Sequence, residues 1–107
     1  MRQLGHVRVG SVDYQIIEAT PRERKVLRDC YGACIAHKGI ILLRAGLAEG
    51  VKLETLVHEL GHALFYGSGA QSYLKTVLAD PDKAEEVEEM LLQILTPMAL
   101  GVRGSVE

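Results

Sequence analysis

The chain has 107 residues, a formal net charge of −2 and two cysteines. This length suits a single hydrophobic core, so we expect residues 1–107 to form one domain. The slightly acidic balance argues against nucleic acid as a partner. No apolar run approaches the roughly 20 residues that a membrane span needs, and the first residues lack the apolar core of a secretory signal. We therefore expect a cytoplasmic protein without a membrane partner.

The amino-terminal part carries the pattern of a β-hairpin. Apolar and polar side chains alternate through residues 6–18, on both sides of Gly10-Ser11. Alternation of this kind around a glycine-led turn is typical of two short antiparallel strands. The side chains expected to face the core are Val7, Val9, Val12 and Tyr14.

A second hairpin is predicted after a charged connector, residues 22–29, which has room for one helical turn. Its strands are residues 31–36 and 40–44, and its turn contains His37 and Gly39. The run 40–44 begins with four apolar residues in succession, which suits a strand buried on both faces or a sheet edge covered by a ligand. The two cysteines, at positions 30 and 34, are expected to be reduced, buried thiols.

Three helices are predicted in the remainder of the chain. The first runs from about residue 51 to 66 and ends at Gly67-Ser68-Gly69, because glycine is favoured just beyond a helix. The second covers about residues 71–78. The third starts at Pro81 or Asp82 and continues to about Leu95. Its expected buried stripe is Val87, Met90, Leu91, Ile94 and Leu95.

The first of these helices contains the sequence His58-Glu59-Leu60-Gly61-His62. Residues four apart lie on one face of a helix, so His58 and His62 can offer two imidazoles to one metal ion. Zinc accepts such nitrogen ligands in tetrahedral geometry. Glu59 lies beside them and can take a proton from a zinc-bound water. The pattern therefore predicts a zinc site of the His-Glu-x-x-His type.

A catalytic zinc commonly has three protein ligands, so a third must come from elsewhere. The other histidines, His6 and His37, do not lie at a spacing that completes the motif, which favours a carboxylate. The acidic cluster 85–89 is its best source. In His-Glu-x-x-His enzymes completed by a glutamate, the ligand helix often reads Glu-x-x-x-Asp, and the second acid orients a ligand histidine. Glu85 with Glu89 fits this spacing, so Glu85 is the preferred ligand and Glu86 is the alternative. Other acids remain possible ligands. Among them Asp82 is a weak candidate, because it is suited to capping the helix. Glu88 is expected to lie on the solvent-exposed face.

These segments resemble the small zinc metallopeptidases of phages and mobile elements that are related to the ImmA/IrrE group and similar to gluzincins. The resemblance is carried by residues 55–64 and 85–95. It implies a zincin-like α+β domain, with antiparallel hairpins packed on the motif helix and a carboxy-terminal ligand helix. It also implies zinc held by His58, His62 and Glu85, with Glu59 as general base.

The predicted activity is hydrolysis of peptide bonds in a peptide or protein substrate by a zinc-activated water. The candidate donors to the developing oxyanion are Tyr66, Tyr73 and His37. Residues 40–44, if they form a sheet edge, could pair with an extended substrate. The alternative is a catalytically silent, zincin-like module of a phage or mobile element that binds a protein without cutting it.

Overall fold

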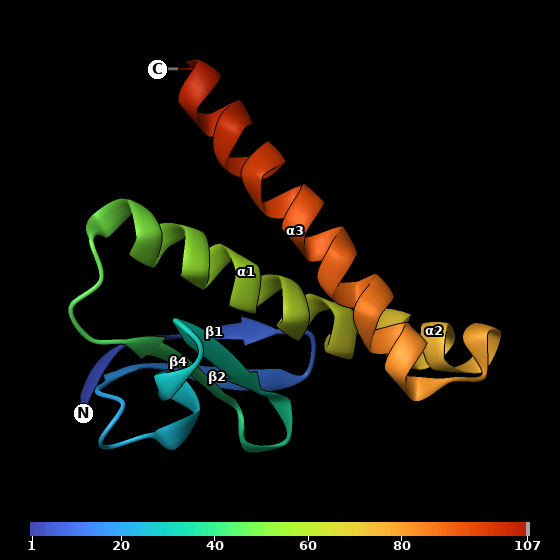
Figure 1. Ribbon diagram of the computed structural model, residues 1–107, viewed down its shortest axis with the longest axis horizontal. Helices are drawn as coiled ribbons and strands as arrows, with labels where there is room; N and C mark the ends of the chain where they lie inside the picture. Colours follow the sequence, from blue (N-terminus) through green and yellow to red (C-terminus); the bar gives the residue numbers. More distant parts are fainter. Residues whose placement is uncertain (107) are drawn as a thin grey trace.

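The computed structural model describes the backbone of residues 1–106 and the side chains of residues 1–96. It is an α+β domain in which a four-stranded mixed sheet packs against three helices (Figure 1). The strands are β1 (Arg2–Val9), β2 (Val12–Ala19), β3 (Gly32–Ile35) and β4 (Ile40–Arg44). The helices are α1 (Glu49–Gly67), α2 (Ala70–Leu78) and α3 (Pro81–Val106).

The sheet has the strand order β1-β2-β4-β3. Both predicted hairpins are confirmed, since β1 pairs with β2 and β3 pairs with β4 in antiparallel fashion. The two hairpins join through parallel pairing of β2 with β4, so the sheet as a whole is mixed. Gly39 makes the second turn possible: its φ is +63°, and an added Cβ would lie 2.6 Å from the carbonyl oxygen of Asp13.

Strand β4 lies inside the sheet and contributes to the core on both faces. Ile41 and Leu43 are fully buried on the α1 side, whereas Leu42 is buried on the opposite face. That opposite face is covered by Leu27, which belongs to a short 3-10 turn (Lys25–Arg28) in the connector. The α1 side also contains the four side chains predicted to face the core from the first hairpin: Val7, Val9, Val12 and Tyr14.

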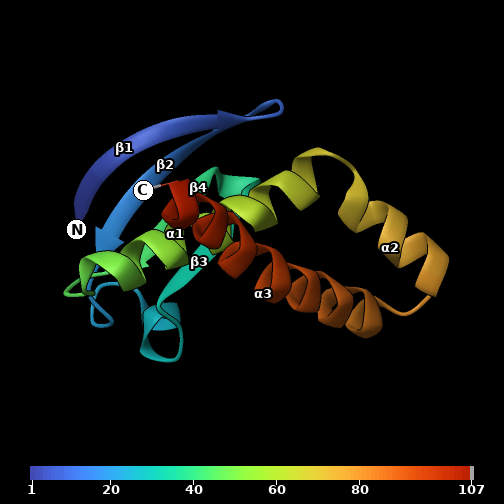
Figure 2. The same ribbon diagram turned by 90° about the horizontal axis from the view of Figure 1, so that it is seen from above.

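Helix α1 lies along the sheet, and α3 crosses it on the side away from the sheet (Figures 1 and 2). The predicted glycine-bounded end of α1 is confirmed, because the helix stops at Gly67 and Gly69 has a φ of +81°. Helix α3 extends beyond the predicted end at Leu95. Over the described residues, no helix is both long and apolar enough to cross a membrane.

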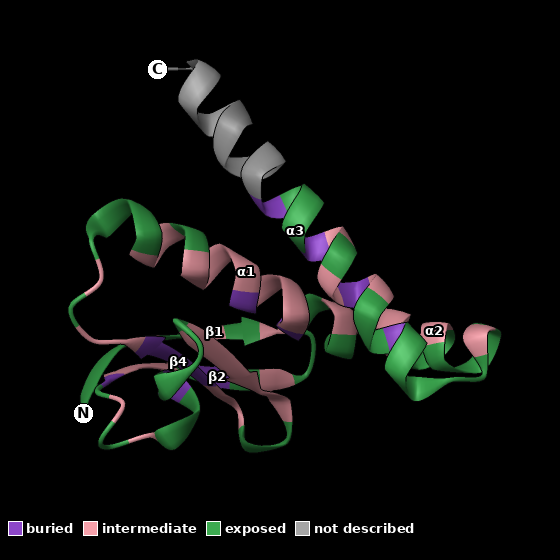
Figure 3. Cartoon of the chain, viewed as in Figure 1, coloured by how far each residue is buried: buried purple, intermediate pink, exposed green. Residues whose placement is uncertain are grey.

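The face that α3 turns inward differs from the predicted one. Met90, Ile94 and Leu95 are exposed. The buried side chains recur every four residues instead, at Ala84, Glu88, Leu92 and Thr96 (Figure 3). Gly61 of α1 explains this rotation, because a Cβ at that position would lie 2.4 Å from Leu92 Cδ2. Leu92 thus packs against the backbone of α1 at Gly61, where no side chain intervenes. This contact sets which side of α3 faces the motif helix.

Candidate metal centre

His58 and His62 project from neighbouring turns of α1, as their spacing predicts. Their ring centroids are 4.9 Å apart and the ring planes meet at 78°. The opposite face of α1 is held on the sheet by Leu56, Leu60 and Ala63. The helix therefore presents two imidazoles on a support that is packed against the core.

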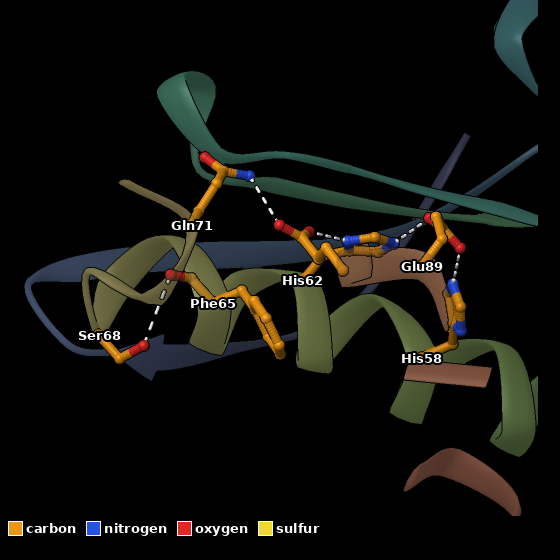
Figure 4. A network of polar contacts seen from close by, with 7 residues as sticks. His58, His62, Phe65, Ser68, Gln71 and Glu89 are labelled. Carbon is orange, nitrogen blue, oxygen red and sulfur yellow. Dashed lines mark hydrogen bonds and ion pairs between the residues drawn. The ribbon is translucent and has the colours of Figure 1, made fainter. Parts of the chain in front are cut away.

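Helix α3 brings Glu89 to both histidines (Figure 4). One carboxylate oxygen lies 2.7 Å from His62 Nε2, and the other lies 3.3 Å from His58 Nε2. One donor atom from each of these three residues can be chosen so that all lie within 4.8 Å of one another. Tetrahedral zinc with bonds of about 2.0–2.2 Å places its ligands roughly 3.3 Å apart. Ligand atoms as far as 4.8 Å apart would have to move closer together to bind one such ion.

Glu88 approaches His62 from the other side of the ring. Its Oε2 lies 2.5 Å from His62 Nδ1, while Gln71 Nε2 donates a hydrogen bond of 3.1 Å to its Oε1. Burial lowers the pKa of His62, but the hydrogen bond to Glu88 and the charges of Glu59, Glu89 and Glu88 together raise it. A carboxylate can only accept, so Glu88 favours a proton on Nδ1 and Glu89 favours one on Nε2. The two acids together therefore favour the charged form of His62 in the metal-free protein.

Glu59 is the single acid within the motif, and it is only 7% exposed. It lies between α1 and β3, where an added Cβ on Gly32 would be 3.2 Å from Glu59 Cγ. Burial raises the pKa of Glu59 to about 7; the His62 charge lowers it and the Glu89 charge raises it. A carboxyl group with this pKa can accept and return a proton near neutral pH.

Strand β3 and the three helices border a cleft of about 980 Å³. One wall is β3 with the residues before it, including Cys30 and Cys34; the other walls are α1, the start of α2, and α3. Because β3 is an edge strand and β4 is interior, the sheet edge that borders the cleft is that of β3. The prediction that both cysteines are buried is wrong for Cys30, which is exposed, while Cys34 is partly buried.

The structure brings Glu89, and not the preferred Glu85, to the two histidines. Glu85 lies one turn earlier and lines the cleft without joining this group, and Glu86 is exposed. The expectation that Glu88 is solvated is wrong, because it is 5% exposed and bonded to His62. The rotation of α3 explains these differences, since it points Glu88 inward and moves the contact with the histidines one turn along the helix.

The candidate oxyanion donors are divided between two locations. Tyr66 and His37 line the cleft, on α1 and in the turn before β4 respectively. Tyr73 is 68% exposed on α2 and does not line it. Only the first two can therefore face a molecule held in the cleft.

Gln71 and Glu88 are the site residues that sequence reasoning missed. Glu88 belongs to a run of acidic residues, which is typical of a solvent-exposed helix face. Gln71 lies on a separate helix, and no motif surrounds it in the sequence. Comparison with known proteins gives no further guide: no family model matches the chain, and no curated protein or solved structure matches it.

Proposed function

We propose that this chain is a zincin-like, zinc-dependent peptidase that hydrolyses peptide bonds. The observation that carries the proposal is the approach of the Glu89 carboxylate to the Nε2 atoms of both His58 and His62. Two imidazole nitrogens and one carboxylate oxygen form the ligand set of many catalytic zinc sites, in which the fourth position is left for water or substrate.

The residues that would hold zinc are His58, His62 and Glu89. A zinc ion in this position would polarise a substrate carbonyl and acidify a water molecule. The pair on α1 fixes two corners of the site, because both residues belong to one helix packed on the sheet. Glu89 supplies the third corner from α3, so the site depends on the crossing of these two helices.

Glu59 is the proposed general base. As a carboxylate it accepts a proton from the attacking water, and as a carboxylic acid it returns that proton to the leaving amine. Its burial against Gly32 keeps the side chain between α1 and β3. In the metal-free protein, burial raises the pKa of Glu59 to about 7, and a zinc ion beside it would lower this pKa and favour the carboxylate that accepts the proton.

The proposed substrate is an extended segment of polypeptide. Strand β3 borders the cleft, and its outer edge has no neighbouring strand in the sheet. An extended chain can add to such an edge through main-chain hydrogen bonds, which place a peptide bond near the metal with little dependence on side chains. Tyr66 and His37 are the candidates to donate to the carbonyl oxygen as it becomes charged.

The test uses the zinc-loaded protein and a mixture of peptides digested from a whole proteome, with cleavage read by mass spectrometry. The Glu59→Gln variant should retain zinc and lose turnover by about 100- to 10,000-fold, the usual effect of a general base. Glu49→Gln is the matched control, because Glu49 lies on the same helix but outside the cleft; its turnover should be unchanged.

Two results would contradict the proposal. Zinc binding by the wild-type protein without cleavage of any peptide would favour the alternative of a module that binds a protein without cutting it. Equal turnover of Glu59→Gln and wild type would instead remove Glu59 from the reaction.

A further inference from the structure

Glu88 is an unusual residue for the interior of so small a domain. Its side chain is 6% exposed, and no lysine or arginine among the residues with described side chains pairs with it. A buried carboxylate that lacks a lysine or arginine partner is costly unless its oxygens receive hydrogen bonds. The two oxygens of Glu88 have one donor each: His62 Nδ1 at 2.5 Å and Gln71 Nε2 at 3.1 Å.

Helix α2 delivers the second of these donors. The chain leaves α1 at Gly67 and turns at Ser68 and Gly69, where the φ of +81° at Gly69 allows a sharp change of direction. The first turn of α2 then brings Gln71 back beside α3, against which α2 packs. The connection between α1 and α2 consists only of Ser68 and Gly69. Because it is so short, the amide of Gln71 can reach Glu88.

We propose that Gln71 is a positioning residue for the metal centre, acting through Glu88 and His62. This inference rests on the proposed function, since it assumes that His62 Nε2 binds zinc. By donating to Oε1, Gln71 holds the Glu88 carboxylate in one orientation and keeps Oε2 on His62 Nδ1. The proton on Nδ1 then leaves the Nε2 lone pair directed at the metal, and the hydrogen bond raises the basicity of the ligand.

The amide of glutamine suits this position. A glutamate would place two carboxylates side by side without a donor between them, and an alanine would leave Oε1 unpaired in a buried place. Either change leaves the Glu88 carboxylate free to rotate. The ring of His62 is then held less firmly in one orientation. Mutating a residue that hydrogen-bonds to a metal ligand commonly lowers metal affinity by 10- to 100-fold. Gln71 contacts His62 only through Glu88, so its replacement should act at the lower end of that range.

The experiment compares wild type, Gln71→Ala and Gln71→Glu, with Ser72→Ala as the control for helix α2. Ser72 is exposed on the same helix, so its replacement changes helix propensity without touching the site. Zinc affinity is measured by competition with a chromogenic chelator. The His62 Nδ1–H proton of the zinc-loaded protein is observed by NMR as a signal protected from exchange with water.

Both Gln71 variants should bind zinc about 10-fold more weakly and lose the protected Nδ1–H signal, while Ser72→Ala matches wild type. Gln71→Glu has nearly the same shape as the native side chain, so its effect separates donation from packing. In a Glu88→Ala background, Gln71→Ala should cause no further loss.

Unchanged affinity and an unchanged Nδ1–H signal in both Gln71 variants would overturn the inference. Failure of the proposed function looks different: the wild type itself would take up no zinc, or would take it up and cut no peptide. A loss in Gln71→Ala that persists in full in the Glu88→Ala background would also overturn it, because Gln71 would then act by another route.

Discussion

Replacing Gly61 by alanine should push α3 away from the motif helix. The new Cβ would lie 2.4 Å from Leu92 Cδ2, whereas carbon atoms in contact are about 3.5–4.0 Å apart, so roughly 1 Å of space is missing. Leu92 is only 3% exposed and has little room to turn aside. Overpacking of this kind costs about 1–3 kcal/mol, against a gain of about 0.5–1 kcal/mol when glycine becomes alanine in a helix.

The net expectation for Gly61→Ala is a loss of about 0–2.5 kcal/mol in the free energy of unfolding, measured with urea on metal-free protein. Zinc affinity should fall as well, by about 10-fold or more, because Glu89 precedes Leu92 by one turn and moves with it. Gly50→Ala is the matched control. Gly50 is in α1 with nothing within 4 Å of its added Cβ, so this variant should be slightly more stable and bind zinc normally.

Leu92→Ala should relieve the clash, so the double variant should lose less stability than the two single variants together. The reasoning is refuted if Gly61→Ala is as stable as Gly50→Ala and keeps full zinc affinity. In that case the contact between Gly61 and Leu92 would not determine how α3 meets the metal site.

Three further predictions follow from the site. In metal-free protein, burial raises the pKa of Glu59 from its ordinary 4.5 to about 7. The folded state therefore binds this proton more tightly than the unfolded state does. Its contribution to the free energy of unfolding, about 3 kcal/mol at most, is present below pH 4.5 and is lost as the pH rises through 7. Urea titrations should show this loss in wild type and not in Glu59→Gln; parallel curves would contradict it. Glu89→Ala should weaken zinc binding by more than the 10- to 100-fold typical of outer partners, and Glu85→Ala should leave it nearly unchanged; the reverse order in a chelator competition would return the ligand role to Glu85. Gly32→Ala places a Cβ 2.6 Å from Thr55 Cγ2 and 3.2 Å from Glu59 Cγ. Because this displaces Glu59 and not the zinc ligands, peptide turnover should fall at unchanged zinc content. Normal turnover would argue that β3 does not position Glu59.

The helices and both hairpins could be predicted because their signals are local. Alternation around Gly10 and the glycines after α1 each act within a few residues of chain. The parallel pairing of β2 with β4 could not be predicted in the same way. It depends on how the connector and β3 return the chain across the sheet, and no short pattern in the sequence records that path.

The histidine pair of the site was predictable for the same reason, since spacing along one helix decides which side chains share a face. The third carboxylate was not, because it depends on how two helices cross. Several faces of α3 carry both acids and apolar residues, and the contact of Leu92 with Gly61 selects among them. Glu88 is buried only because His62 and Gln71 satisfy it, and such pairing is visible only in three dimensions.

The most direct test of the central claim is a crystal structure of the zinc-loaded protein with anomalous diffraction data at the zinc absorption edge. The account predicts one zinc bound by Nε2 of His58 and of His62 at about 2.0–2.1 Å and by a carboxylate oxygen of Glu89 at about 2.0–2.2 Å, with no protein atom in the fourth position. A peak away from these histidines, Glu85 in place of Glu89, or a fourth protein ligand would contradict it.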